Sequence, residues 1–150
     1  MRTTTLKPLS SGDARAAILS CHDELRSLVT ETIHFAESGC DFEPLRTHAR
    51  ELYEALEEHL DFEERILPMA LRDVIGWGSV LQAQVFEGHE KQRAILASAR
   101  SALEPAALSP ARLAQSVRTL ADTILVDLKT EESCLLSADL DALATDANGG

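Results

Sequence analysis

The chain has 150 residues, enough for one domain with its own hydrophobic core. Hydrophobic residues make up 45% and aromatic residues 4%, a balance typical of helix-rich interiors built on Leu, Ala, Ile and Val. The formal net charge of -11 argues against nucleic-acid or anionic-membrane partners, since both bind clustered Lys and Arg.

The cellular setting follows from what the sequence lacks. It holds no apolar stretch long enough to span a bilayer, and its first residues, MRTTTLKPLSSGDAR, lack the apolar region of a secretory signal. We therefore expect a cytoplasmic protein, in which Cys21, Cys40 and Cys134 stay reduced. Their odd number and wide spacing fit neither a disulfide framework nor a zinc site made of cysteines.

The first half of the chain predicts two helices, because its apolar residues recur at helical spacing. The first helix covers about residues 13–37, and Gly39 favours its end. The second helix has Pro44 in its first turn and continues to Leu67. Pro68 is expected to disturb or end it, because proline lacks the amide hydrogen that a helix interior needs.

The second half predicts two more helices. Residues 73–78 contain two glycines and form a connection. The third helix covers about residues 79–103. Ser109 and Pro110 are residue types favoured at the N-cap and at the first helical position, so the fourth helix begins there. We expect this helix to end near Asp139, followed by a frayed tail.

Four helices of about 25 residues joined by short connections predict an all-α fold, an antiparallel up-down-up-down four-helix bundle. No β-branched run or hairpin turn signal in the sequence supports a sheet. Residues 1–150 are expected to form a single domain, with residues 1–12 and 140–150 flexible.

The most informative pattern is an acidic motif that occurs twice. HLDFEERIL from His59 and DLKTEESCL from Asp127 share the pattern Leu-x-x-Glu-Glu-x-x-Leu after their first residue. Residues four apart in a helix lie on one face, so His59 pairs with Glu63, and Asp127 pairs with Glu131. Each pair is a candidate for binding metal, because imidazole and carboxylate are common metal ligands.

Two further histidines, His22 and His89, fall at the same level of the predicted bundle. Counted from the end where the first helix begins, they lie about ten residues along their helices, and the two pairs lie about seven to eleven residues along theirs. Six polar groups in one layer of an apolar core are costly to bury unless they are paired or coordinate a metal ion. The candidate metal ligands are therefore His22, His59, Glu63, His89, Asp127 and Glu131.

Three imidazoles and three carboxylates suit iron, manganese or zinc. Carboxylates can bridge two metal ions, so Glu63 and Glu131 are the candidate bridges. Asp127 is either a ligand or an acceptor that orients a ligand histidine. The sequence has no Glu-x-x-His motif, which argues against a ferritin-like di-iron site.

The neighbours of these residues receive simpler interpretations. Glu64 and Glu132 lie about 100° around the helix from the candidate bridges, which favours solvated or capping roles. Cys134 is interpreted as a small buried hydrophobic residue. Cys21 adjoins His22 but points elsewhere, and no function is assigned to it.

The order of these residues resembles the hemerythrin-like (HHE cation-binding) family over about residues 15–137. The segments that carry the resemblance are CHDEL around His22, HLDFEERILP from His59, GHEKQ around His89 and DLKTEESCLL from Asp127. The resemblance implies a non-haem di-iron site. By motif position, the ligands that it implies are His22, His59, Glu63, His89 and Glu131.

Two positions depart from the family pattern. The fourth helix of this family normally carries His where this chain has Asp127, which is shorter and anionic. An anionic ligand favours a higher metal charge and weakens selection for ferrous iron. Oxygen-carrying hemerythrins also have a second His one turn after the third-helix His, where this chain has Arg93. Since Arg93 cannot ligate, reversible oxygen carriage is not expected.

These features predict a small cytoplasmic hemerythrin-like protein with iron, most simply as a di-iron site, and with zinc or manganese as alternatives. It is expected to handle oxygen species, nitric oxide or iron, with a small diatomic molecule or peroxide as ligand and as a monomer or homodimer. The alternatives are a metal- or redox-responsive regulatory module and a bundle with a single structural zinc. No enzyme activity is assigned, because the sequence identifies no separate nucleophile, general base or substrate pocket.

Overall fold

The computed structural model describes residues 9–39, 41–74, 76–104 and 109–148, with side chains up to Ser137. Residues 1–8 and 149–150, expected to be flexible, and Cys40 lie outside the described residues. The described ranges hold four helices and no strand, which confirms the all-α prediction for them. The helices are α1 (Ser11–Glu37), α2 (Phe42–Ala70), α3 (Gly78–Ser101) and α4 (Pro110–Asn148).

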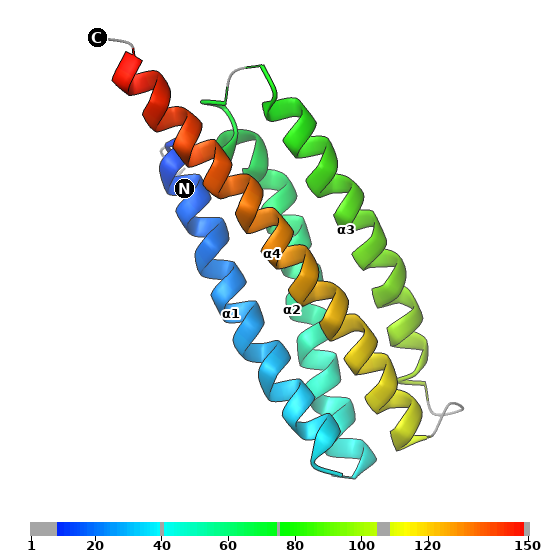
Figure 1. The fold of residues 1–150 in the computed structure, drawn as a ribbon. Helices are drawn as coiled ribbons and strands as arrows, with labels where there is room; N and C mark the ends of the chain where they lie inside the picture. Colours follow the sequence, from blue (N-terminus) through cyan, green and yellow to red (C-terminus); the bar gives the residue numbers. More distant parts are fainter. Residues whose placement is uncertain (1–8, 40, 75, 105–108, 149–150) are drawn as a thin grey trace, which may run out of the picture.

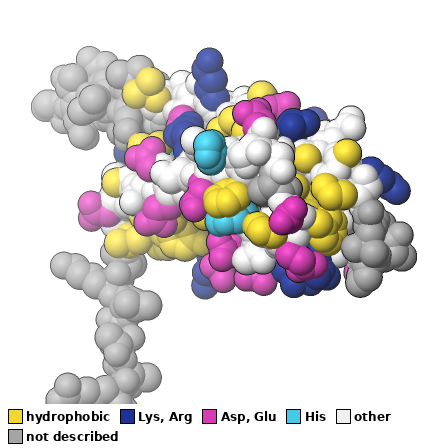
Figure 2. Space-filling model, turned by 90° about the horizontal axis from the view of Figure 1, so that it is seen from below, with side chains coloured by type: hydrophobic (Ala, Val, Ile, Leu, Met, Phe, Trp, Pro, Cys, Tyr) yellow, Lys and Arg dark blue, Asp and Glu magenta, His cyan; other side chains and the backbone are white. Residues whose placement is uncertain are grey.

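The helices lie side by side in a four-helix bundle (Figure 1). In that view α1 ends and α2 begins at the lower end, α2 ends and α3 begins at the upper end, and α3 ends and α4 begins at the lower end. The view from below in Figure 2 shows Lys and Arg side chains scattered among Asp and Glu. Within the described residues, no helix is long and apolar enough to cross a membrane.

The helix ends follow the capping residues. Ser10 caps α1, because its Oγ accepts a hydrogen bond from the Asp13 amide at 3.1 Å. Ser109 caps α4 in the same way, accepting from the Arg112 amide at 3.3 Å, as predicted. After α1, Gly39 takes a φ of 69°, a left-handed conformation that glycine adopts without steric cost.

One predicted helix end lies two residues further along the chain, and another was wrong. Helix α2 continues through Pro68 to Ala70, because proline in the last turn removes only one backbone hydrogen bond. Helix α4 runs to Asn148 rather than to about Asp139. The added segment is rich in Ala and Leu and contains no glycine or proline, so nothing in its composition stops the helix.

A layer of buried polar residues divides the apolar core. One apolar cluster contains Leu25, Leu56, Leu96 and Ile124, and the other contains Ile18, Leu67, Val85 and Leu135. Along each helix the buried polar residues stand between members of the two clusters. This order agrees with the predicted single layer of polar groups. The buried members of that layer are His22, His59, Glu63, His89, Gln92 and Glu131.

Replacing Leu56 with alanine should test the apolar cluster. Leu56 is fully buried, so we expect Leu56→Ala to lower the free energy of unfolding in urea by about 2–5 kcal/mol. Val126 is 64% exposed, so the control Val126→Ala should change it by less than about 0.5 kcal/mol. Similar losses in both variants would contradict this assignment of the core.

Candidate metal centre

Four buried side chains converge at one point of the polar layer. The nearest ligand atoms of His22, His59, Glu63 and Glu131 all lie within 4.8 Å of one another. His89 joins this group through its Nε2 atom, which lies 3.0 Å from Glu131 Oε1. The structure thus brings together five of the six predicted ligands, and the tightest four could hold a metal ion.

Each of the two glutamates presents one oxygen to each side of the group. Glu63 Oε2 lies 2.7 Å from His59 Nε2 and 3.3 Å from His22 Nε2, whereas Glu63 Oε1 lies 3.7 Å from His89 Nε2. Glu131 Oε2 lies 3.1 Å from His22 Nε2, and its Oε1 lies near His89. The oxygens therefore divide the group into a half with His22 and His59 and a half with His89. Carboxylates that bridge two metal ions have this arrangement.

Several buried polar atoms of this layer have no hydrogen-bond partner. They are His59 Nδ1, Glu63 Oε1, Gln92 Oε1, Asp127 Oδ2 and Glu131 Oε2. Glu131 Oε2 is close enough to His22 Nε2 for an ion pair, but the angles do not suit a hydrogen bond. A buried polar atom without a partner is costly, and a coordinated cation satisfies the lone pairs of carboxylate oxygens. The donor set therefore fits a metal ion.

Asp127, the sixth predicted ligand, lies beside the tight group rather than within it. It occupies α4 one turn before Glu131, and both residues line a small cavity between α3 and α4. Burial raises the pKa of Asp127, and the charge of Glu131 raises it further, whereas a hydrogen bond with Gln92 opposes the shift. Its Oδ2 is buried without a hydrogen-bond partner.

Gln92 is a neighbour of this centre that the sequence did not reveal. Its side chain is buried on α3, one turn after His89, and its Oε1 has no hydrogen-bond partner. The Gln92 side chain therefore points into the bundle at this position of α3. The Arg93 side chain, which cannot ligate, points instead toward Glu64 and Asp61.

A glutamate and an arginine hold the outer nitrogen of His22. Its Nδ1 lies 3.4 Å from Glu132 Oε1, and Arg26 donates to both oxygens of Glu132, at 2.6 and 2.5 Å. The bidentate ion pair fixes the carboxylate, and the carboxylate fixes the ring. The Nε2 atom of His22 is consequently directed at Glu63 and Glu131.

A matching series of hydrogen bonds holds the His89 ring. Its Nδ1 lies 3.3 Å from Glu64 Oε1, and Arg93 donates to both oxygens of Glu64. Glu64 and Glu132 were predicted to have solvated or capping roles, and this prediction was wrong. Both lie at helix interfaces, where the arginine of the neighbouring helix meets them and neutralises their charge.

An internal repeat could have revealed these partners. HDELR from His22 on α1 matches HEKQR from His89 on α3, and in both the Arg lies one turn after the His. The repeated Glu-Glu motifs of α2 and α4 complete the match, so the two halves of the centre are built alike. They differ where His59 in one half corresponds to Asp127 in the other.

The charges of the centre reinforce one another in the metal-free state. Burial lowers the pKa of His22 and His89, but the close carboxylates of Glu131 and Glu63 outweigh it and raise the values to about 9 and about 10. Burial favours the protonated form of Glu63, but hydrogen bonds from the histidines hold the pKa of its carboxyl well below the usual range. Protonated imidazoles thus face ionised carboxylates, and a bound cation would replace these protons.

Comparison with models of protein families, with curated proteins and with solved structures yields no significant match to this chain. The resemblance to the hemerythrin-like family therefore stays a prediction. The function is inferred from the geometry of the centre together with the motifs that build it.

The metal-free protein should lose stability as the pH rises from 6.5 toward 10, the range between the ordinary histidine pKa and the value for His89. A group whose pKa is raised by folding stabilises the folded state fully at a pH below its pKa in the unfolded chain. This stabilisation is lost as the pH rises through the pKa of the folded state. Urea denaturation of chelator-treated protein at several pH values measures this. A metal-loaded sample is the control, because coordination favours the deprotonated imidazole. If the stability of the metal-free protein did not change over this pH range, the pairing of protonated imidazoles with ionised carboxylates would be contradicted.

The hydrogen bonds that link Arg26, Glu132 and His22 should increase the affinity of the centre for metal ions. We expect Glu132→Gln to weaken metal binding by about tenfold to a hundredfold, because the partner that orients the imidazole loses its charge. Arg118→Gln is the control, since Arg118 is exposed on the same helix. Competition between the protein and a chelator for zinc measures both affinities. Equal affinities in the two variants would show that Glu132 does not support the centre.

Proposed function

We propose that the chain is an antiparallel up-down-up-down bundle that holds a non-haem di-iron centre, as a hemerythrin-like protein. One observation carries the proposal: Glu63 and Glu131 each direct one oxygen toward each half of a buried group of histidines. The repeated motifs of the sequence and their resemblance to the hemerythrin-like family support the same reading.

In this proposal the two metal positions have different ligands. His22 and His59 would hold one position, and His89 and Asp127 would hold the other. Glu63 and Glu131 would be shared between the two positions. Imidazole with carboxylate, and no thiolate in the group, suits iron, with manganese and zinc as alternatives.

A bound di-iron centre would supply redox chemistry and an open coordination position for a small ligand such as dioxygen, nitric oxide or a peroxide. The protein orients His22 and His89 through Glu132 and Glu64, and it keeps both Nδ1 protons on the outer side of the rings. The two apolar clusters enclose the polar layer along the bundle and limit the access of water. We propose that the protein handles oxygen species, nitric oxide or iron in the cytoplasm, where its free thiols stay reduced.

A single structural zinc is the second candidate. His22, His59, Glu63 and Glu131 alone form a closed set of four ligands, the number that a structural zinc ion takes. Asp127 and His89 would then pair with protein groups. In that case the metal would stabilise the bundle without any redox chemistry.

Metal content distinguishes the candidates. We expect tag-free protein reconstituted with ferrous iron to retain about two irons per chain by elemental analysis and to be coloured when oxidised. Glu63→Gln should lose most of both ions, because Glu63 faces both halves of the group. His48→Gln, remote from the centre on the same helix, is the control and should keep both. One zinc ion per chain and a colourless protein would contradict the di-iron proposal.

A further inference from the structure

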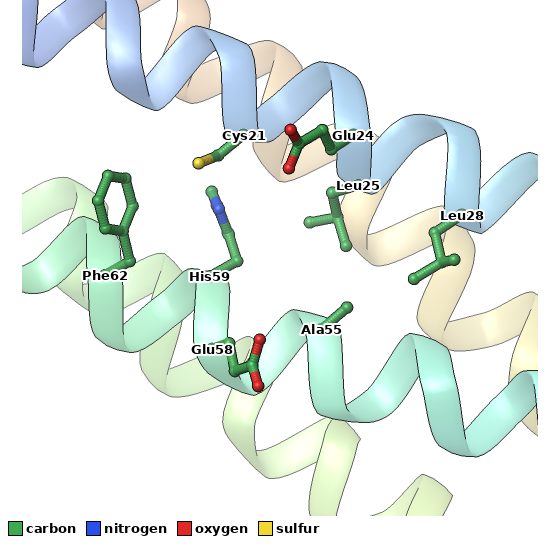
Figure 3. A pocket seen from close by; sticks show the side chains of 8 residues that line it. All are labelled: Cys21, Glu24, Leu25, Leu28, Ala55, Glu58, His59 and Phe62. Atoms are coloured by element: carbon green, nitrogen blue, oxygen red, sulfur yellow. The ribbon is translucent and has the colours of Figure 1, made fainter.

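A cavity between α1 and α2 lies directly beside the metal centre. Its volume is about 390 Å³, and Leu25 and Phe62 belong to its apolar wall. Its polar groups are Cys21 and Glu24 of α1, and Glu58 and His59 of α2. Figure 3 shows the His59 ring rising from α2 toward the Cys21 thiol, with the Glu24 carboxylate next to them. His59 thus belongs to both the cavity and the centre.

His59 differs from the other two buried histidines in how it is held. The outer nitrogens of His22 and His89 are fixed by glutamates that are themselves paired with arginines. The Nδ1 of His59 is buried without a hydrogen-bond partner, and its side chain is only 5% exposed. Its Nε2 lies 2.7 Å from Glu63 Oε2, and its ring meets the edge of the His22 ring, with the centroids 5.0 Å apart. The ring can therefore turn without breaking an outer hydrogen bond.

The polar groups of the cavity suit a divalent cation. An imidazole, a thiol and two carboxylates are all metal-ligating groups, and they stand on the two helices that face each other. The chain as a whole is strongly acidic, and such a field concentrates cations at an acidic mouth.

The opposite side of the bundle lacks such an approach. The cavity over Asp127, between α3 and α4, has a volume of only about 40 Å³. In the internal repeat Gly88 takes the place of Cys21, so this side has no thiol at the matching position. Access to the centre is therefore open on the side of His59.

We propose that the cavity between α1 and α2 is the route by which a divalent metal ion enters the centre, and that His59 passes the ion inward. The ion is attracted by Glu24 and Glu58 and is then bound by Cys21 Sγ and the His59 imidazole. The thiol proton leaves to solvent when sulfur binds the ion and returns when the ion moves on to Glu63. This inference rests on the proposed metal-binding function.

The rate of metal uptake tests the route. Metal-free protein is mixed with cobalt(II) chloride in a stopped-flow instrument, and the absorption of bound cobalt is followed to completion. We expect the double variant Glu24→Gln/Glu58→Gln to take up cobalt about tenfold more slowly than the unmodified chain, with the same final content. Cys21→Ser should also slow uptake severalfold, because the first binding step loses its sulfur ligand.

Two matched controls separate the route from a general loss of charge or thiol. Glu87→Gln/Glu90→Gln removes the same charge from exposed positions beside His89, and Cys134→Ser removes a thiol from the opposite side. Both should keep the original rate. Unchanged rates in the cavity variants, or equal slowing in the controls, would overturn the entry route and leave the metal centre standing. Failure of the unmodified chain to bind cobalt or iron would overturn the proposed function itself.

Discussion

The structure depends on two carboxylates that are buried where an apolar core would otherwise be continuous. Glu63 is fully buried and Glu131 is nearly so, and both meet histidines from neighbouring helices. A buried carboxylate is strongly destabilising unless a positive charge lies close to it. In the metal-free protein, protonated His22 and His89 supply that charge. A metal ion would supply it more fully, since it also satisfies the oxygens that lack partners.

The surrounding structure serves to fix this layer. The apolar clusters on either side align the four helices, so that residues distant in sequence reach one level. The hydrogen bonds through Glu132 and Glu64 then fix the direction of two imidazoles from outside the layer. His59 has no such support, and this difference underlies the inferred route for metal entry. Two of the three buried imidazoles are thus held from outside the layer, and the third is not.

Much of this organisation follows from the sequence because helical periodicity is regular. The spacing of four between His59 and Glu63 and between Asp127 and Glu131 fixes which face each pair occupies. Similar distances from the predicted helix ends placed these residues at one level, although α4 runs on to Asn148. Ser109 and Gly39 mark boundaries that the structure retains. Five of the six residues predicted as ligands therefore meet at one level, although the prediction used no contact between helices.

Helical periodicity could not predict which side chains of neighbouring helices contact one another. Glu132 and Glu64 point partly outward on their own helices, so their roles depend on Arg26 and Arg93 of neighbouring helices. Gln92 was missed for a similar reason, because its place beside Asp127 depends on how α3 is rotated against α4. In the sequence, the repeated His-x-x-x-Arg spacing was the signal for these hydrogen-bonded groups of Arg, Glu and His.

The proposed di-iron centre has two metal ions between Glu63 and Glu131. A crystal structure of the iron-loaded protein, with anomalous scattering recorded at the iron absorption edge, measures this most directly. We expect two anomalous peaks about 3.5–4 Å apart, one beside His22 and His59 and the other beside His89. A single peak among His22, His59, Glu63 and Glu131, or no peak in this layer, would contradict the account.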